Sequence, residues 1–189
     1  MAVDFEQRRF TVDEYLRMAE SGVFGPDERV ELLDGVVVSV PPSGPEHASV
    51  VNELFLLFAK RIGDRVTLRC QTSVVLGTRS MPEPDIGIFA RVEGRYRDRH
   101  PDERDALALI EISRSRLAYD RGPKMRVYAR SRVPDYWIID LVGKRVEVYR
   151  DPTDIGYAPP AVLLPGDSVA LLAVPGEEFA VAELLRPEA

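Results

Sequence analysis

Hydrophobic side chains recur at intervals of mostly three and four residues in the segment that follows Pro45. The positions are Val50, Val51, Leu54, Phe55, Leu57, Phe58 and Ile62. Such a broad apolar stripe is typical of a helix that packs against a core rather than of a cofactor site. Ser43 and Glu46 have the spacing of a capping box at the start of this helix, and Thr11 and Glu14 have the same spacing at the start of a shorter one.

Apolar runs bounded by turn-forming residues predict the strands. Residues 30–33 and 36–40 flank Asp34-Gly35, a pair favoured in the tight turn of a β-hairpin. A second hairpin is predicted from residues 136–141 and 145–149. The other predicted strands are residues 65–76, 81–90 and 106–112, with a charged loop at residues 92–105. Short apolar runs after Asp151 indicate edge strands and a closing helical turn.

This order of elements predicts an α/β fold, arranged as an α+β structure around a mixed sheet. At 189 residues the chain is long enough for one compact domain with a hydrophobic core. We expect a single domain over residues 1–189. Within it, residues 1–42 form an N-terminal helix and hairpin, residues 43–150 form the core, and residues 151–189 form C-terminal edge strands.

Composition narrows the class of protein. The single cysteine, Cys70, excludes an internal disulfide and a cysteine-rich zinc site. No apolar run approaches the length of a bilayer-spanning helix, and the acidic N-terminus lacks the features of a signal peptide. We therefore expect a cytoplasmic location and no membrane partner. The chain has no glycine-rich phosphate-binding loop, so we expect no organic cofactor.

The charge is unevenly distributed. The formal net charge is −6, which disfavours a polyanionic partner, but residues 151–189 carry seven acidic residues against Arg186 alone. Between Arg91 and Arg132 there are twelve basic residues against seven acidic ones. This surplus is compatible with a surface that faces phosphates, and equally with a solvated arginine-rich loop.

Two acidic residues border or interrupt apolar runs. Asp85 stands directly before the apolar run of residues 86–90, and Glu111 is the only charge in residues 106–112, where burial is costly without a partner. If these strands pair antiparallel, the start of one lies beside the end of the other. Pro123 suits the first turn of a helix, and Asp120 suits its N-cap. Lys124 would lie on this helix and point toward the two carboxylates. Two carboxylates and a lysine so placed predict a cation site.

In this order the motifs resemble the Uma-type family of restriction-endonuclease-like proteins, which belongs to the PD-(D/E)XK nuclease superfamily. The matching segments are Pro84-Asp85, Glu111-Ile112-Ser113, Asp120 to Lys124, Tyr128, Val133 to Asp140, Glu31 to Gly35, and Pro45-Glu46-His47. The superfamily pattern has a lysine where this chain has Ser113. Within the Uma-type pattern the following helix supplies the lysine, which Lys124 matches.

The resemblance implies a restriction-endonuclease-like core, a central mixed sheet flanked by helices, with an added N-terminal hairpin. It implies a metal-dependent endonuclease that hydrolyses phosphodiester bonds in DNA. Asp85, Glu111, Lys124 and Glu31 would be the catalytic residues. Asp85 and Glu111 would hold Mg²⁺, for which Mn²⁺ can substitute.

The resemblance also implies supporting roles in substrate binding or around the catalytic residues. The residues concerned are His47, Ser113, Asp120 and Tyr128. Three plainer interpretations stay open from the sequence. Glu31 could face solvent from its strand, His47 could be purely structural, and Lys124 could be an ordinary exposed helix lysine.

Other functions compete with the nuclease. The chain could be a catalytically silent module of nuclease fold that binds nucleic acid or a protein, since Ser113 departs from the superfamily pattern. It could be a structural homodimer in which Trp137 and the apolar C-terminal segment form the interface. Another metal hydrolase is a third alternative, although the chain has only two histidines. We expect DNA and a second copy of the chain as partners.

Overall fold

A six-stranded mixed sheet forms the centre of the molecule. The structure is a computed structural model and describes residues 7–42 and 44–185. The strands are β3 (Thr67–Cys70), β4 (Ile86–Phe89), β5 (Ala106–Ser113), β6 (Tyr136–Asp140), β7 (Arg145–Tyr149) and β8 (Ala161–Leu163), and they lie side by side in this order. Only β5 and β6 run parallel, and the other neighbours are antiparallel. The predicted mixed sheet is confirmed.

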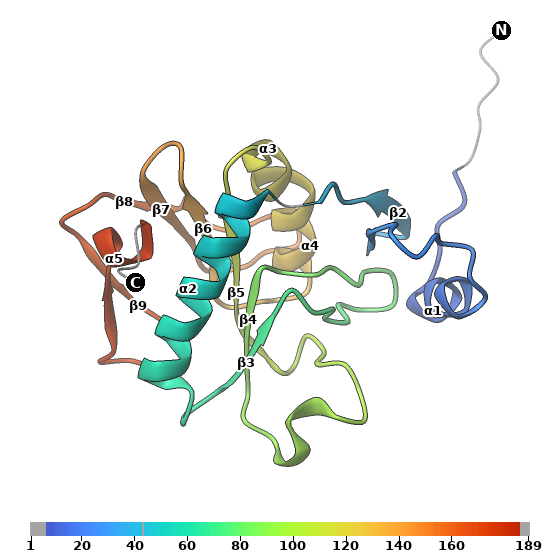
Figure 1. Cartoon of the computed structure of the whole chain (residues 1–189), viewed down its shortest axis with the longest axis horizontal. Coiled ribbons are helices and arrows are strands. Elements are labelled where there is room, and N and C mark those ends of the chain that lie inside the picture. The colour runs from blue at the N-terminus through green and yellow to red at the C-terminus, as the bar shows by residue number, and fades with distance from the viewer. Residues whose placement is uncertain (1–6, 43, 186–189) are drawn as a thin grey trace, which may run out of the picture.

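Helices cover both faces of this sheet. Figure 1 shows α2 (Pro45–Ile62) crossing one face, where its Leu54 and Phe58 pack in a core that includes Trp137. Strands β9 (Ser168–Ala170) and β10 (Glu178–Ala180) and helix α5 (Val181–Leu185) add side chains to the same core. On the other face, α4 (Met125–Arg130) buries Tyr128 against Tyr136. The alternation of Tyr136 and Trp137 between two cores follows from the period of two in a strand.

The burial of Trp137 corrects one expectation. Its side chain is 0% exposed and stacks against α2, with its ring 6.5 Å from that of Phe58. Trp137 therefore cannot contribute to a two-fold interface, because no part of it reaches the surface. A homodimer formed in another way stays a prediction.

The N-terminal elements agree with the local signals. Helix α1 (Val12–Glu20) begins with the predicted capping box between Thr11 and Glu14. Strands β1 (Val30–Leu33) and β2 (Val36–Ser39) form the predicted hairpin, with positive φ angles at both turn residues, Asp34 and Gly35. A bridge from Leu32 to Met81 joins the hairpin to the segment before β4. The hairpin is a separate two-stranded sheet that is joined in this way to the segment leading into β4.

Apart from the predicted strand at residues 81–90, of which only β4 is regular, three expectations differ from the structure. The predicted strand at residues 65–76 is regular only over β3, which ends at Cys70 where Gln71 adopts a left-handed φ of 45°, and residues 73–76 make only isolated bridges. The predicted cap at Ser43 lies outside the described residues, and α2 has Gly44 as its N-cap.

The third difference lies beside the expected site. The helix does not begin at Asp120: α3 (Leu117–Tyr119) precedes it, and a π-helical turn, η2 (Asp120–Lys124), connects α3 to α4. Asp120 is thus inside the helix and caps nothing. Pro123 has no N–H to donate, and a widened turn accommodates the lost hydrogen bond. A short 3₁₀ helix, η1 (Glu93–Tyr96), lies in the charged loop. Among the described residues, no helix combines the length and apolarity needed to cross a bilayer.

Candidate active site

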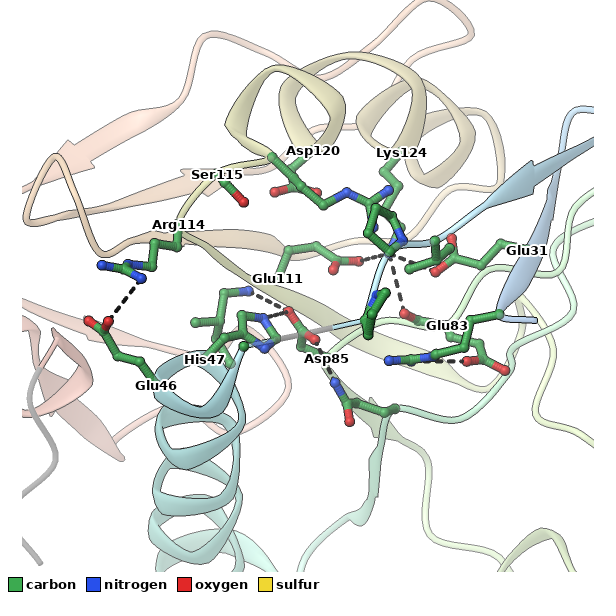
Figure 2. A pocket seen from close by; sticks show the side chains of 18 of the residues that line it. Glu31, Glu46, His47, Glu83, Asp85, Glu111, Arg114, Ser115, Asp120 and Lys124 are labelled. Atoms are coloured by element: carbon green, nitrogen blue, oxygen red, sulfur yellow. Dashed lines mark hydrogen bonds and ion pairs between the residues drawn. The ribbon is translucent and has the colours of Figure 1, made fainter. Parts of the chain in front are cut away.

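Acidic residues from separate parts of the chain meet around one cavity. The cavity has a volume of about 600 Å³ and lies between the N-terminus of α2, the end of β5 and the η2 turn. Glu31, Asp85, Glu111, Asp120 and Lys124 all line it (Figure 2). Six of the eight predicted site residues thus line this cavity: the four carboxylates, Lys124 and His47.

Antiparallel pairing brings Asp85 to the end of β5, as expected. Ile86 of β4 pairs with Ile110 of β5, so the residue before β4 lies beside the last residues of β5. The main-chain N–H of Ile112 donates to Asp85 Oδ2 at 2.9 Å. The neighbouring Glu111 faces the same cavity from inside β5.

Lys124 is the cation at the centre of this group. Its Nζ donates to Glu111 Oε1 at 2.9 Å, lies 3.3 Å from Glu31 Oε1, and donates to the main-chain carbonyl of Glu83 at 3.3 Å. The side chains of Lys124, Glu31 and Glu111 are each at most 5% exposed. The interpretations of Lys124 as an exposed helix lysine and of Glu31 as solvent-facing are therefore wrong.

Burial and charge shift the protonation equilibria of the group. Burial raises the pKa of Glu111 to about 8, although Lys124 acts in the opposite direction. Burial likewise raises the pKa of Glu31 and of Asp120, again opposed by Lys124. Burial alone would lower the pKa of Lys124, but Glu111, Glu31 and Asp85 hold that pKa above its ordinary value. Lys124 therefore stays charged, whereas the buried carboxyl groups around it bind protons more readily than exposed ones do.

Asp85 is held by hydrogen bonds on both oxygens. His47 lies in the first turn of α2, and its Nε2 is 3.1 Å from Asp85 Oδ2. Gln71 Nε2 donates to Asp85 Oδ1 at 3.2 Å. Burial raises the pKa of Asp85, but the hydrogen bond and charge of His47 outweigh burial and leave that pKa below its usual range. The hydrogen bond to Asp85 in turn raises the pKa of His47.

The three remaining predicted residues, Tyr128, Asp120 and Ser113, are placed in three different ways. Tyr128 is fully buried, and its hydroxyl donates to Glu111 Oε1 at 2.6 Å, so it supports the site without lining the cavity. Asp120 is buried and lines the cavity. Ser113 is buried and does not line the cavity, but its hydroxyl lies close enough to Asp120 to lower the pKa of that carboxyl against the effect of burial.

Sequence reasoning did not single out several residues of the cavity. Gln71 could not be predicted as a site residue, because in the sequence it is an ordinary polar turn residue. In the structure its backbone is left-handed, and its side chain donates to Asp85. Arg114 and Arg116 lie on the loop after β5, and Glu46 lies at the start of α2. The regional surplus of arginine indicated this part of the chain, but no local pattern distinguished these two from the other arginines.

The donor set suits a hard divalent cation, which prefers carboxylate oxygens. Glu31 Oε2 is buried and has no hydrogen-bond partner among the described residues. Both hydrogen bonds to the Glu111 carboxylate go to Oε1, and Asp85 Oδ1 accepts one bond where a carboxylate oxygen can accept two. The described residues nevertheless contain no group of three His, Cys, Asp or Glu side chains already arranged around a metal position. Lys124 instead bridges Glu31 and Glu111.

The chain resembles known proteins over most of its length. A crystal structure titled as a "putative nuclease belonging to DUF820" from Anabaena variabilis matches it with a TM-score of 0.66 and 18% sequence identity. The match covers 93% of this chain and 97% of that one, and it shows a shared fold. No curated protein matches the chain significantly. A family model described as "Putative restriction endonuclease" matches residues 12–182. The chain therefore belongs to this family, Uma2.

Proposed function

We propose that the protein is a metal-dependent endonuclease that hydrolyses phosphodiester bonds in DNA. The observation that carries the proposal is the meeting of Asp85, Glu111 and Lys124, which come from three separate segments of the chain, around one cavity. Membership of a family described as "Putative restriction endonuclease" and a fold shared with a protein titled as a "putative nuclease" support the same reaction class.

Asp85 and Glu111, joined by Glu31, would hold Mg²⁺ or Mn²⁺ through their carboxylate oxygens. When bound, the ion polarises the scissile phosphate and lowers the pKa of a water molecule. The buried, unpartnered Glu31 Oε2 supports the inclusion of Glu31 as a third donor.

Side chains of the protein offset the charge that develops in the reaction and hold the carboxylates in place. Lys124 keeps its positive charge in a buried site, so it can offset negative charge that develops on the phosphate oxygens. Tyr128 and Lys124 together fix one oxygen of Glu111, and His47 and Gln71 fix the Asp85 carboxylate. Rigid placement of this kind removes the reorganisation that water would need in solution.

The direct test is nicking of supercoiled plasmid by purified protein with Mg²⁺ or Mn²⁺. Asp85→Ala should lower the rate by about two orders of magnitude or more. Asp98→Ala removes an exposed carboxylate of the charged loop and should leave the rate unchanged. Retained cleavage in Asp85→Ala, at the wild-type rate and with the fold intact, would remove the assignment.

A silent binding module is the second candidate. Ser113 stands where the superfamily pattern has lysine, and the described residues hold no preformed group of three metal-binding side chains. This candidate predicts DNA or protein binding without cleavage. Plasmid that stays supercoiled at saturating Mn²⁺, together with measurable DNA binding, would favour it over the enzyme.

A further inference from the structure

Two arginines stand beside the acidic cavity on the loop that follows β5. Arg114 and Arg116 both line the cavity, three and five residues after Glu111 along the chain. In Figure 2, Arg114 faces Glu46 of α2 on the side of the cavity away from Glu31. Basic side chains thus border a hollow whose inner residues are mostly acidic.

The contacts of Arg114 leave it free to change partner. Among the described residues its guanidinium makes one ion pair, to Glu46 Oε2 at 3.0 Å. The side chains are 57% and 60% exposed, and an ion pair so open to solvent contributes little to stability. A phosphate could therefore replace Glu46 as the partner of Arg114 at low cost.

Arg116 is held in place by an aromatic ring rather than by a carboxylate. Its guanidinium carbon lies 4.3 Å from the centre of the Tyr119 ring, a stacking that limits its motion. Over residues 7–42 and 44–185 it makes no ion pair within 4.0 Å, whereas Arg61, Arg99 and Arg121 each bind carboxylates. Its hydrogen-bonding groups are thus available to a ligand.

We propose that Arg114 and Arg116 bind phosphates of the DNA backbone that flank the scissile bond, and that Glu46 is the counter-ion Arg114 gives up on binding. This inference rests on the proposed function. A guanidinium presents paired N–H groups that match two phosphate oxygens. The acidic side chains of the cavity suit a metal cation, and the arginines beside them suit the anionic DNA strand. The metal ion and the DNA would therefore bind to different residues.

The test is fluorescence anisotropy of a labelled short duplex, with Ca²⁺ in place of Mg²⁺ and KCl varied from about 50 to 200 mM. Arg114→Gln and Arg116→Gln should each weaken binding about tenfold and lower the slope of log K against log salt by about one. The loss should be equal on two unrelated sequences, because phosphate contacts carry no base information. Glu46→Gln should tighten binding, since Arg114 no longer has a competing partner.

Arg104→Gln is the matched control. Arg104 is exposed, has Asp102 as its one ion-pair partner in the part of the chain that the structure describes, and does not line the cavity. Melting temperatures of all variants check that each is folded. If the wild type binds and cleaves DNA but Arg114→Gln and Arg116→Gln behave like Arg104→Gln, the phosphate contacts are wrong and the nuclease stands. If the wild type neither binds nor cleaves, the proposed function is wrong, and the phosphate contacts with it.

Discussion

Replacement of Lys124 by methionine tests whether the buried charges depend on one another. Met has a similar length and no charge, so Lys124→Met leaves Glu31 and Glu111 buried without the ammonium that lies 3.3 and 2.9 Å away. Loss of one partner from a buried ion pair costs about 3–5 kcal/mol. Small domains have about 5–15 kcal/mol of stability, so the variant should lose a large part of it.

The loss should depend on pH in a defined direction. Burial raises the pKa of Glu111 from 4.5 to about 8 in the folded protein, so between these values the folded state holds a proton that the unfolded chain has released. Its contribution to stability is present below pH 4.5 and is lost as the pH rises through about 8. Without Lys124 the pKa rises further, so Glu111 holds its proton in both folded proteins below about pH 8, and the deficit of Lys124→Met should be constant there and grow as the pH rises above about 8.

Urea unfolding monitored by circular dichroism from pH 5 upward measures this. Lys60→Met is the control, because Lys60 is exposed on α2 and its loss should change the free energy of unfolding by less than about 0.5 kcal/mol. The double variant Lys124→Met/Glu111→Gln should recover part of the loss. A Lys124→Met deficit below about 1 kcal/mol, or one independent of pH, would refute the reasoning, since either means that the carboxylates do not need the ammonium.

Two further substitutions test the support around the site. Tyr128→Phe removes the 2.6 Å hydrogen bond to Glu111 and should cost about 1.5–3 kcal/mol in urea unfolding, and a change below about 0.5 kcal/mol would contradict that role. Glu147→Gln weakens the contacts of buried Glu147 with Arg121 of the η2 turn. Burial raises the pKa of Glu147, but Arg121 and Tyr149 outweigh burial and lower it, so its stabilisation is present above the unfolded pKa and lost in acid. The variant should therefore show a smaller loss of stability on acidification, and an unchanged acid profile would contradict this.

Much of the fold follows from local signals. The hairpin at residues 30–39 and the capping box at Thr11 were predictable because a few adjacent residues determine each. The approach of Asp85 to the end of β5 followed from strand pairing, which a two-residue period makes visible in sequence. The end of β3 at Cys70 was not predictable, since it depends on a left-handed backbone at a glutamine.

The site was only partly predictable for a related reason. That Glu31 faces Lys124 depends on how the N-terminal hairpin sits against the rest of the fold, which no local pattern specifies. The π-helical turn that carries Asp120 and Lys124 was missed because Pro123 also suits the start of an ordinary helix. That Arg116 pairs with no carboxylate of the described residues could not be predicted either, because it depends on which carboxylates the fold brings to each arginine.

The measurement that tests the central claim most directly is a crystal structure soaked with Mn²⁺ and analysed by anomalous diffraction. The account predicts an anomalous peak within coordination distance of both Asp85 and Glu111, close to 2.0–2.2 Å, roughly as for other hard divalent ions. The same soak of Asp85→Ala should lack the peak. Mn²⁺ bound only elsewhere on the wild-type protein, with Lys124 still bridging Glu31 and Glu111, would contradict the account.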